Sequence, residues 1–295
     1  MREGSIAGRG LDRSRREPPD PASKGRGDRR RYTFEPPRES DGTMSPEQPS
    51  VNFEKSRELS AEAPTLIEGL PGLGLVASIA VDQITRQLGL EEYGTISSEA
   101  FPAVASFEDG RVRESVRVYA GADPDVMTLQ SDVPMPGGAV RPLSRCVLED
   151  LAKEFDRAVF LAGAPAESEA QIGEVVGVAT TDELEAELTD AGIALAEGSG
   201  ILGGITGALL ADCYRAEVPA AVLITRSNPY IPDPGAARSV IESALEPMVS
   251  FDIDTTELEE RAEEIRQRKQ QIAQQLREQR EQQGGEQSTV SRMYQ

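Results

Sequence analysis

The stretch PTLIEGLPGLGLVASIAVDQITRQLG, residues 64–89, decides the fold class of this chain of 295 residues. Its first part, TLIEGL, is a short apolar run between Pro64 and a Pro/Gly break, which is typical of a buried strand. From Leu73 onward apolar residues recur at helical spacing, and Gly89 closes the predicted helix. The next segment, EEYGTISS at 91–98, predicts a second strand. A strand, a helix and a strand in this order form a βαβ unit and indicate an α/β protein.

The chain continues to alternate between strand and helix patterns after this unit. The segment RAVFLAGAPA, residues 157–166, is apolar throughout, which is typical of a strand covered on both faces. The sequence EDG at 108–110 is a turn signal between two strand patterns and predicts a hairpin. We therefore predict one domain over residues 61–252, a three-layer α/β/α sandwich with a mixed, mostly parallel sheet. The other predicted strands are 125–131, 174–180, 193–198 and 219–226, and the other predicted helices are 139–154, 181–192, 205–217 and 233–250.

The charge of the chain is strongly negative and unevenly distributed. Residues 1–43 hold 11 of the 31 bases and 8 of the 51 acids, a net charge of +3, so the remainder has 20 bases against 43 acids, a net charge of −23. An acidic body repels nucleic acids and anionic membranes, so we expect neither as a partner. Only four lysines occur, and this acid-rich, lysine-poor composition indicates a cytoplasmic protein of a halophile.

Histidine is absent, which removes the usual general base and the usual metal ligand. We therefore predict no catalytic residue, no metal site and no cofactor. Cys146 and Cys213 fall in predicted helices among aliphatic residues, which predicts buried free thiols and no disulfide. The longest apolar stretch, ILGGITGALLADC at 201–213, is too short and too rich in glycine to span a membrane. Residues 1–43 lack the apolar core of a signal peptide.

Residues 1–60 are dominated by Arg, Pro, Gly, Ser and Glu. A segment with so few clustered aliphatic residues does not offset the entropy lost on ordering, so we predict that it is disordered. One interpretation of residues 1–43 is a mis-assigned extension, with Met44 as the true start. The other is a functional basic arm.

Residues 255–283 carry a heptad pattern and predict a separate C-terminal helix. Its seam pairs either with a preceding helix of its own domain or with another subunit, and we favour a coiled coil that forms a homo-oligomer. We expect Gly284 and Gly285 to end the helix and residues 284–295 to form a flexible tail. The seam residues are Leu258, Ala262, Ile265, Lys269, Ile272 and Leu276, spaced four, three, four, three and four apart.

The loop at 69–77, between the first strand and the first helix, is rich in glycine. Gly72, Gly74 and Ala77 match the dinucleotide fingerprint G-x-G-x-x-G/A, in which the helix N-terminus faces a phosphate. A tight turn with close packing explains the same glycines equally well.

A second glycine-rich loop, at 198–207, also precedes a helix. It contains Gly200 and Gly203 but lacks the lysine of a P-loop, and Ser199 has no nucleophile-elbow motif. The alternative function is a nucleotide- or nucleoside-binding enzyme that uses both loops around a shared pocket.

The chain finishes on Met293, Tyr294 and Gln295, so a polar tail ends on an apolar and an aromatic residue. A carboxylate pairs with a cationic side chain while Met and Tyr fill an apolar slot, so three residues make a complete anchor. Several copies presented by one oligomer bind much more tightly than one, because later contacts form at high effective concentration.

Three stretches resemble the archaeal branch of the proteasome assembly chaperone family, over roughly residues 60–250. They are LIEGLPGLGLVASIAVDQI, GITGALL and YIPDPGAARSV. The resemblance implies a fold similar to purine nucleoside phosphorylases, without their catalytic residues. The ending resembles the hydrophobic-tyrosine-any motif by which ATPase rings and ATP-independent activators dock between α-subunits of the proteasome core particle. By that resemblance Met293 packs in the intersubunit pocket, Tyr294 pushes on the gate-controlling turn, and the Gln295 carboxylate meets a pocket lysine.

The motifs together predict a non-enzymatic homo-oligomer whose C-terminal tails bind the proteasome core particle. Assembly chaperone and gate-opening activator both remain open at this point, and the nucleotide-binding enzyme is the alternative.

Overall fold

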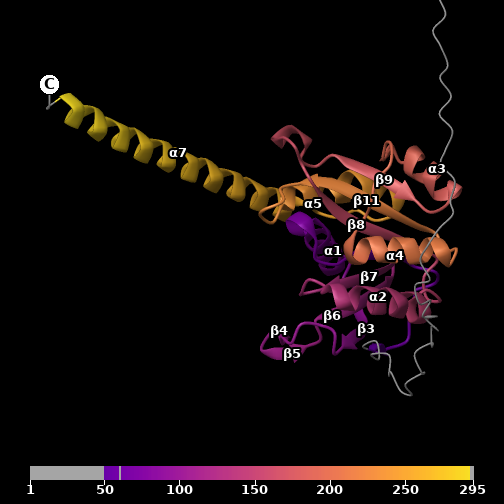
Figure 1. Ribbon diagram of the computed structural model, residues 1–295. Coiled ribbons are helices and arrows are strands. Elements are labelled where there is room, and N and C mark those ends of the chain that lie inside the picture. The colour runs from indigo at the N-terminus through magenta and orange to yellow at the C-terminus, as the bar shows by residue number, and fades with distance from the viewer. Residues whose placement is uncertain (1–49, 60, 293–295) are drawn as a thin grey trace, which may run out of the picture. The chain divides into compact units, whose positions relative to one another are not determined.

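The computed structural model describes residues 50–59 and 61–292, and the side chains of these residues except Ala273 and 276–292 (Figure 1). The strands are β1 (Val51–Lys55), β2 (Thr65–Gly69), β3 (Glu91–Ser98), β4 (Ser106–Glu108), β5 (Arg111–Arg113), β6 (Val116–Ala122), β7 (Asp125–Ser131), β8 (Arg157–Pro165), β9 (Val175–Ala179), β10 (Ala194–Leu195) and β11 (Ala220–Ser227). The helices are α1 (Val76–Gln87), α2 (Gly137–Cys146), α3 (Asp182–Asp190), α4 (Gly204–Arg215), α5 (Pro234–Val240), α6 (Glu246–Met248) and α7 (Thr256–Arg292), with 3-10 turns η1 (Leu73–Leu75) and η3 (Glu169–Gln171) and π-helical turns η2 (Val147–Leu151) and η4 (Ile241–Leu245).

Within the described residues, nine strands form one mixed sheet in the order β1-β3-β6-β7-β2-β8-β11-β9-β10. Strands β7, β2, β8 and β11 are parallel and form its centre. The pairs β1–β3, β3–β6, β6–β7 and β11–β9 are antiparallel. The mixed sheet is confirmed, but parallel pairing predominates only in the centre. Since β9 follows β8 through a connection without a crossover helix, it runs opposite to its neighbour β11.

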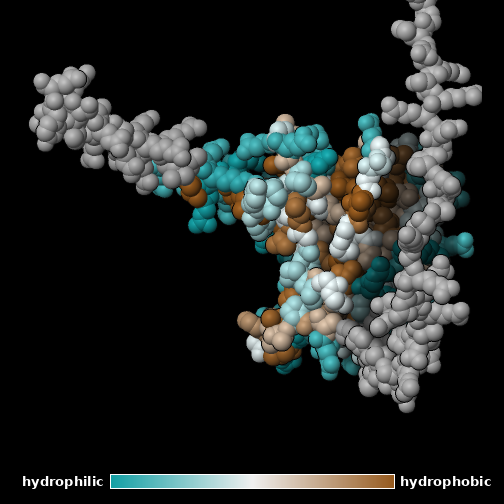
Figure 2. Space-filling model, in the orientation of Figure 1, coloured by the Kyte–Doolittle hydropathy of each residue, from teal (hydrophilic) through white to brown (hydrophobic). Residues whose placement is uncertain are grey.

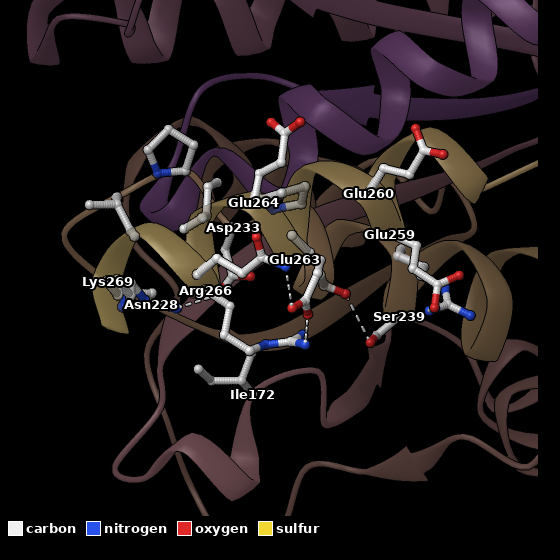
Figure 3. Close-up of a pocket in the computed structure, with 18 of the residues that line it drawn as sticks. Ile172, Asn228, Asp233, Ser239, Glu259, Glu260, Glu263, Glu264, Arg266 and Lys269 are labelled. Carbon is white, nitrogen blue, oxygen red and sulfur yellow. Dashed lines mark hydrogen bonds and ion pairs between the residues drawn. The ribbon is translucent and has the colours of Figure 1, made fainter. Parts of the chain in front are cut away.

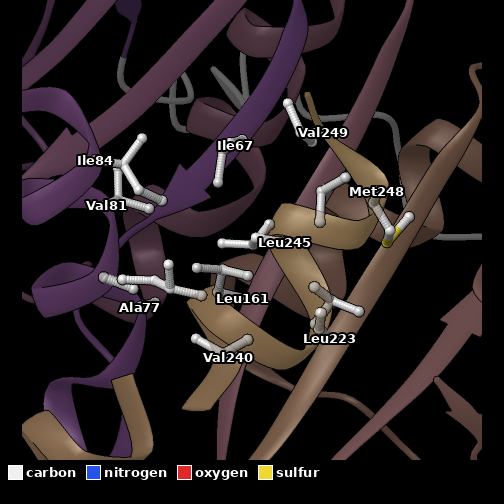
Figure 4. Packing of buried hydrophobic residues seen from close by; sticks show 14 of the residues in the cluster. Ile67, Ala77, Val81, Ile84, Leu161, Leu223, Val240, Leu245, Met248 and Val249 are labelled. Carbon is white, nitrogen blue, oxygen red and sulfur yellow. The ribbon is translucent and has the colours of Figure 1, made fainter. Parts of the chain in front are cut away.

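Helices cover both faces of the sheet, which confirms the predicted three-layer α/β sandwich. One face packs against α1, α3, α5 and η4. Figure 4 shows Ile67, Leu161 and Leu223 of the strands among side chains of α1, α5 and η4. The other face packs against α2, η2 and α4. Cys146 and Cys213 lie on that second face as buried free thiols, and burial raises the pKa of each to about 12.

The sheet begins earlier than the sequence predicted. Residues 1–49 lie outside the described part of the chain, but Val51–Lys55 form the edge strand β1, so the prediction of disorder through residue 60 is wrong there. Val51 and Phe53 alternate with polar residues and pack on the face covered by α2, and the Phe53 ring lies against Gly94 and 5.7 Å from the Tyr93 ring. Two apolar residues at alternate positions anchor a short edge strand that composition alone conceals.

Helix α7 is longer than the sequence predicted. It continues through Gly284 and Gly285 to Arg292, so neither the predicted end at residue 283 nor a flexible segment over 284–292 is found. Glycine costs helical stability but, unlike proline, removes no backbone hydrogen bond, and the Glu, Gln and Arg residues around it favour helix. Residues 293–295 lie outside the described part of the chain.

Candidate interaction surface

The loops that follow the central parallel strands meet at one edge of the sheet, which we call the carboxyl-end edge. The loops after β2, β7, β8 and β11 lie there, because these strands run in the same direction. The β4–β5 hairpin lies at the same edge, since Val116 at the start of β6 pairs with Ser131 at the end of β7. In open α/β sheets this edge usually holds the functional site.

The first glycine-rich loop packs tightly against the neighbouring strands. Leu73 lies so close to Gly163 of β8 that a side chain at Gly163 would overlap the Leu73 backbone. Gly74 has φ +66° and lies against Ser227, and its carbonyl accepts a 2.8 Å hydrogen bond from the Asp233 amide. Gly72, by contrast, is extended and has no close neighbour that excludes a side chain. Close packing therefore explains Gly74, and the loop covers the strand ends where a phosphate would lie in a dinucleotide site.

Glu68, which the sequence analysis missed, lies fully buried beneath this loop at the end of β2. Its carboxylate accepts hydrogen bonds from the Leu70 amide at 2.9 Å and from the Thr206 hydroxyl at 3.2 Å. Desolvation raises the pKa of Glu68 to about 8, although these hydrogen bonds lower it in part. The sequence did contain a signal for this position, because Glu68 is the single charged residue inside the apolar run TLIEGL. A buried acid without a charged partner is rare and would have marked the residue as a site candidate.

The second glycine-rich loop reaches Glu68, which lies beneath the first loop. Thr206 of α4 contacts that carboxylate, while Gly200 and Gly203 face open space. Two pockets that the described residues form, one beside α7 and one beside Tyr214, are lined by no residue of 69–77 or 198–207. Thr206 thus brings the second loop near the first, and neither loop belongs to these two pockets.

Large apolar side chains gather on the surface of the carboxyl-end edge. Within the described residues, six of the eight that are exposed lie there, whereas Tyr214 lies at the far end of α4 and Ile272 on α7. Apolar residues are visible over the β4–β5 hairpin at the lower left of Figure 2. Clustered exposed apolar residues mark interaction surfaces more often than single ones. The six are Leu75, Val104, Phe107, Val112, Ile201 and Tyr230.

Helix α7 leaves the domain at this same edge because it runs antiparallel to α5. The Thr255 hydroxyl donates to Glu242 near the end of the α5–η4 helix, and Arg238 of α5 pairs with Glu259 at 3.3 Å. Further along, Ala262 lies beside the start of α5 at Gly235. Since α5 starts just after β11 ends, α7 passes the carboxyl-end edge shortly after Ala262.

The structure divides the predicted oligomerisation seam into two parts. Leu258 is 0% exposed and belongs to the core of its own domain, so its assignment to an intersubunit seam is wrong. Ala262 and Ile265 are half-buried, while Lys269 and Ile272 are exposed. The first turns of α7 thus pair with a preceding helix of the same domain, an interpretation that the heptad pattern left open. The side chain of Leu276 lies outside the described part.

A groove of about 1250 Å³ lies between α7, the start of α5 and the loop that follows β11. Apolar side chains from three segments line it, namely Ile172, Ile231 and Ile265. Its ionisable lining residues comprise seven acids and three bases, a net charge of −4. Figure 3 shows Glu263 and Arg266 of α7, which form an ion pair, on the side of the groove near Ile172.

The loop on the opposite wall of this groove is held in place by Asp233. Its carboxylate accepts hydrogen bonds from the Asn228 amide at 2.8 Å and the Ala236 amide at 3.1 Å, so it caps α5 as the sequence predicted. The groove is therefore open, acidic and partly lined by isoleucines, which suits a protein segment better than a small ligand.

The predicted docking residues Met293, Tyr294 and Gln295 lie outside the described part of the chain, so the structure does not place them. Among the helices of the described residues, none combines the length and the apolar character needed to cross a membrane.

Comparison with known proteins gives consistent matches. Residues 66–273 match the sequence model of the PAC2 family. The uncharacterized protein MJ0106 of Methanocaldococcus jannaschii is 26% identical over 226 residues, which are 77% of this chain and 92% of that protein. The structure of Pyrococcus furiosus PbaA, an archaeal homolog of proteasome-assembly chaperone, matches with a TM-score of 0.69 and 26% identity, covering 82% of this chain and 99% of PbaA. Pyrococcus furiosus PbaB, an archaeal proteasome activator, has the same fold, with a TM-score of 0.68 at 19% identity over 76% of this chain and 99% of PbaB.

Proposed function

Because the chain belongs to the PAC2 family, we propose that it is a non-enzymatic partner of the proteasome core particle, acting as an assembly chaperone or an ATP-independent activator. The similarity to PbaA supports this proposal, since it extends over nearly the whole of that chain. The packing of the first glycine-rich loop supports the non-enzymatic part, because Leu73 and Gly74 lie where the enzyme alternative needs a ligand.

The observation that carries the proposal is the course of α7. The helix leaves the carboxyl-end edge near Ala262 and runs to Arg292, about 30 residues or about 45 Å at 1.5 Å per residue. A helix of this length presents the residues that follow it well clear of the domain. We propose that Met293, Tyr294 and Gln295, carried by α7, dock into the pockets between α-subunits of the core particle.

Docking of this kind requires several copies, because a three-residue anchor binds weakly by itself. We propose that the protein is a homo-oligomer and that the exposed part of the seam contributes to it. Ile265, Lys269 and Ile272 lie along the stretch of α7 that emerges from the domain, and Leu276 continues their spacing.

The proposal is tested by co-sedimentation of the full chain with core particle in high salt. Deletion of Met293–Gln295 and the substitution Tyr294→Ala are both expected to abolish association, while oligomer mass and circular dichroism stay unchanged. Gln295→Ala is the matched control and should still bind, because the motif accepts any residue at that position. Undiminished association after the deletion would show that the docking proposal is wrong.

A second measurement separates the two proposed roles. An activator raises the rate at which preassembled core particle cleaves a small fluorogenic peptide, because it opens the gate. An assembly chaperone leaves that rate unchanged and instead raises the yield of core particle from separate subunits. The nucleotide-binding alternative predicts a higher melting temperature with nucleotides or nucleosides, by mass action.

A further inference from the structure

The β4–β5 hairpin presents an exposed apolar pair. Phe107 and Val112 lie directly opposite each other across its two strands, and they are 74% and 78% exposed. Asp109 and Gly110 both have positive φ and form the tight turn at its tip. A two-stranded hairpin is marginally stable without further packing, so an apolar pair left in water at its tip indicates a contact that another molecule completes.

The base of this hairpin is nevertheless firmly held. Arg113 pairs with Glu108 across the hairpin and lies 3.6 Å from Asp132 of the body. The buried Arg117 makes two hydrogen bonds to that same carboxylate, at 2.7 and 2.8 Å. Ser106 and Ser115 are also hydrogen-bonded, at 3.0 Å. The tip is therefore a preorganised projection, which lowers the entropy lost when it binds.

The hairpin and the acidic groove lie at the same edge of the domain but are separated along it. The hairpin connects β3 to β6, whereas the groove adjoins the end of β11. Strands β7, β2 and β8 lie between β6 and β11, so at about 4.8 Å per strand the two features are about 20 Å apart. The hairpin therefore does not reach the groove of its own copy.

We propose that the hairpin of one copy of this chain inserts into the groove between α7 and the β11–α5 loop of the next copy. The apolar pair Phe107 and Val112 matches the apolar part of the groove lining, which includes Ile172, Ile231 and Ile265.

Charge favours the same pairing. The groove has a net charge of −4, whereas hairpin residues 106–113 carry two acids and two bases in a body of net charge −23. Among the described residues neither Arg111 nor Asp109 at the tip forms an ion pair, so the tip is neutral and does not repel the acidic groove as the rest of the acidic body would. An acidic surface elsewhere on the chain would repel the groove.

Such a contact is head-to-tail, because it joins two different surfaces of the same protein. Repeated around an axis it closes a ring when the rotation permits. Since α7 forms one wall of the groove, every contact also fixes the α7 of the receiving copy. This contact would form the homo-oligomer on which the proposed function depends. Its test measures the mass of the oligomer, whereas the test of the proposed function measures association with core particle, so the failure of one differs from the failure of the other.

The test measures the mass of the full chain in high salt by light scattering after gel filtration. The wild type is expected to be an oligomer, and both the hairpin variant Phe107→Asp/Val112→Asp and the groove variant Ile231→Arg are expected to be monomers. The matched control is Tyr214→Asp, which changes a similarly exposed large apolar residue at the end of α4 away from the carboxyl-end edge and should leave the mass unchanged. Circular dichroism confirms that each variant is folded.

Mixing the two monomeric variants gives the decisive result. The hairpin variant keeps an intact groove, and the groove variant keeps an intact hairpin, so one contact can form between them. The mixture should therefore contain dimers of one hairpin variant and one groove variant, and nothing larger. A monomeric wild type, unchanged mass in either variant, or a mixture that stays monomeric would overturn the proposal. Loss of mass in Ile272→Asp with no loss in the hairpin variant would assign assembly to the α7 seam instead.

Discussion

Replacing Glu68 by glutamine should make the stability of the protein less dependent on pH. Glutamine has nearly the shape of a protonated glutamic acid, and its carbonyl can accept the hydrogen bonds from Leu70 and Thr206. Burial raises the pKa of Glu68 from 4.5 to about 8 in the folded protein. The folded state therefore holds a proton that the unfolded state loses, so stability from this group is complete below about pH 4.5 and is lost as pH rises to about 8.

The magnitude follows from the same two values. Between 4.5 and about 8, at about 1.4 kcal/mol per pH unit, the wild type loses at most about 5 kcal/mol relative to a neutral residue. Relaxation of the loop and water entry reduce this, so we expect the Glu68→Gln variant to gain about 2–5 kcal/mol over wild type between about pH 5 and about pH 9. Near pH 5 the two should differ by about 1 kcal/mol or less.

Chemical denaturation at constant high salt, repeated across this pH range, measures the difference. Taking the difference between variant and wild type cancels every other titrating group. The matched control is Glu260→Gln, which makes the same chemical change at an exposed position of α7. A Glu68→Gln difference that stays flat from about pH 5 to about pH 9 would refute the assignment of a buried neutral carboxyl.

Two further predictions concern the packing of the carboxyl-end edge and of α7. Gly163→Ala should lower the free energy of unfolding by about 2 kcal/mol or more in denaturant titrations, because the added methyl group overlaps the Leu73 backbone. The control Gly138→Ala lies in open space at the start of α2 and should be neutral or slightly stabilising. Leu258→Ala should cost about 2–5 kcal/mol because it leaves a cavity in the domain core, whereas Ile272→Ala should stay within about 0.5 kcal/mol for the unassociated chain. Equal losses in either pair would contradict the packing described.

The sequence predicted the elements with strong patterns and missed those that depend on distant neighbours. The βαβ unit at 64–98, the Asp109–Gly110 hairpin and the Asp233 cap follow from local periodicity and turn chemistry, and all are present. Strand β1 was missed because its two apolar residues follow a long polar segment. Strand β9 was predicted at 174–180, but its antiparallel direction was not, because strand direction depends on the path of the connection.

The candidate site was less predictable than the fold. A G-x-G motif looks the same in the sequence whether its glycines face a phosphate or a packed strand. The contacts that decide between these readings are made by Ser227 and Gly163, which lie far along the chain. The heptad pattern likewise does not reveal that Leu258 packs in the core of its own domain. An apolar heptad position packs equally well against a helix of the same domain and against a helix of another subunit. The docking residues Met293, Tyr294 and Gln295 remain a prediction.

The glycine pair inside α7 has a mechanical consequence. Helical glycine is about 1 kcal/mol less favourable than alanine, so Gly284 and Gly285 together make the weakest turn of the rod, about 2 kcal/mol below an all-alanine equivalent. Bending is therefore concentrated about two turns before Arg292. In the proposed homo-oligomer, a joint at that place would let the end of each α7 change direction independently of the others as it docks.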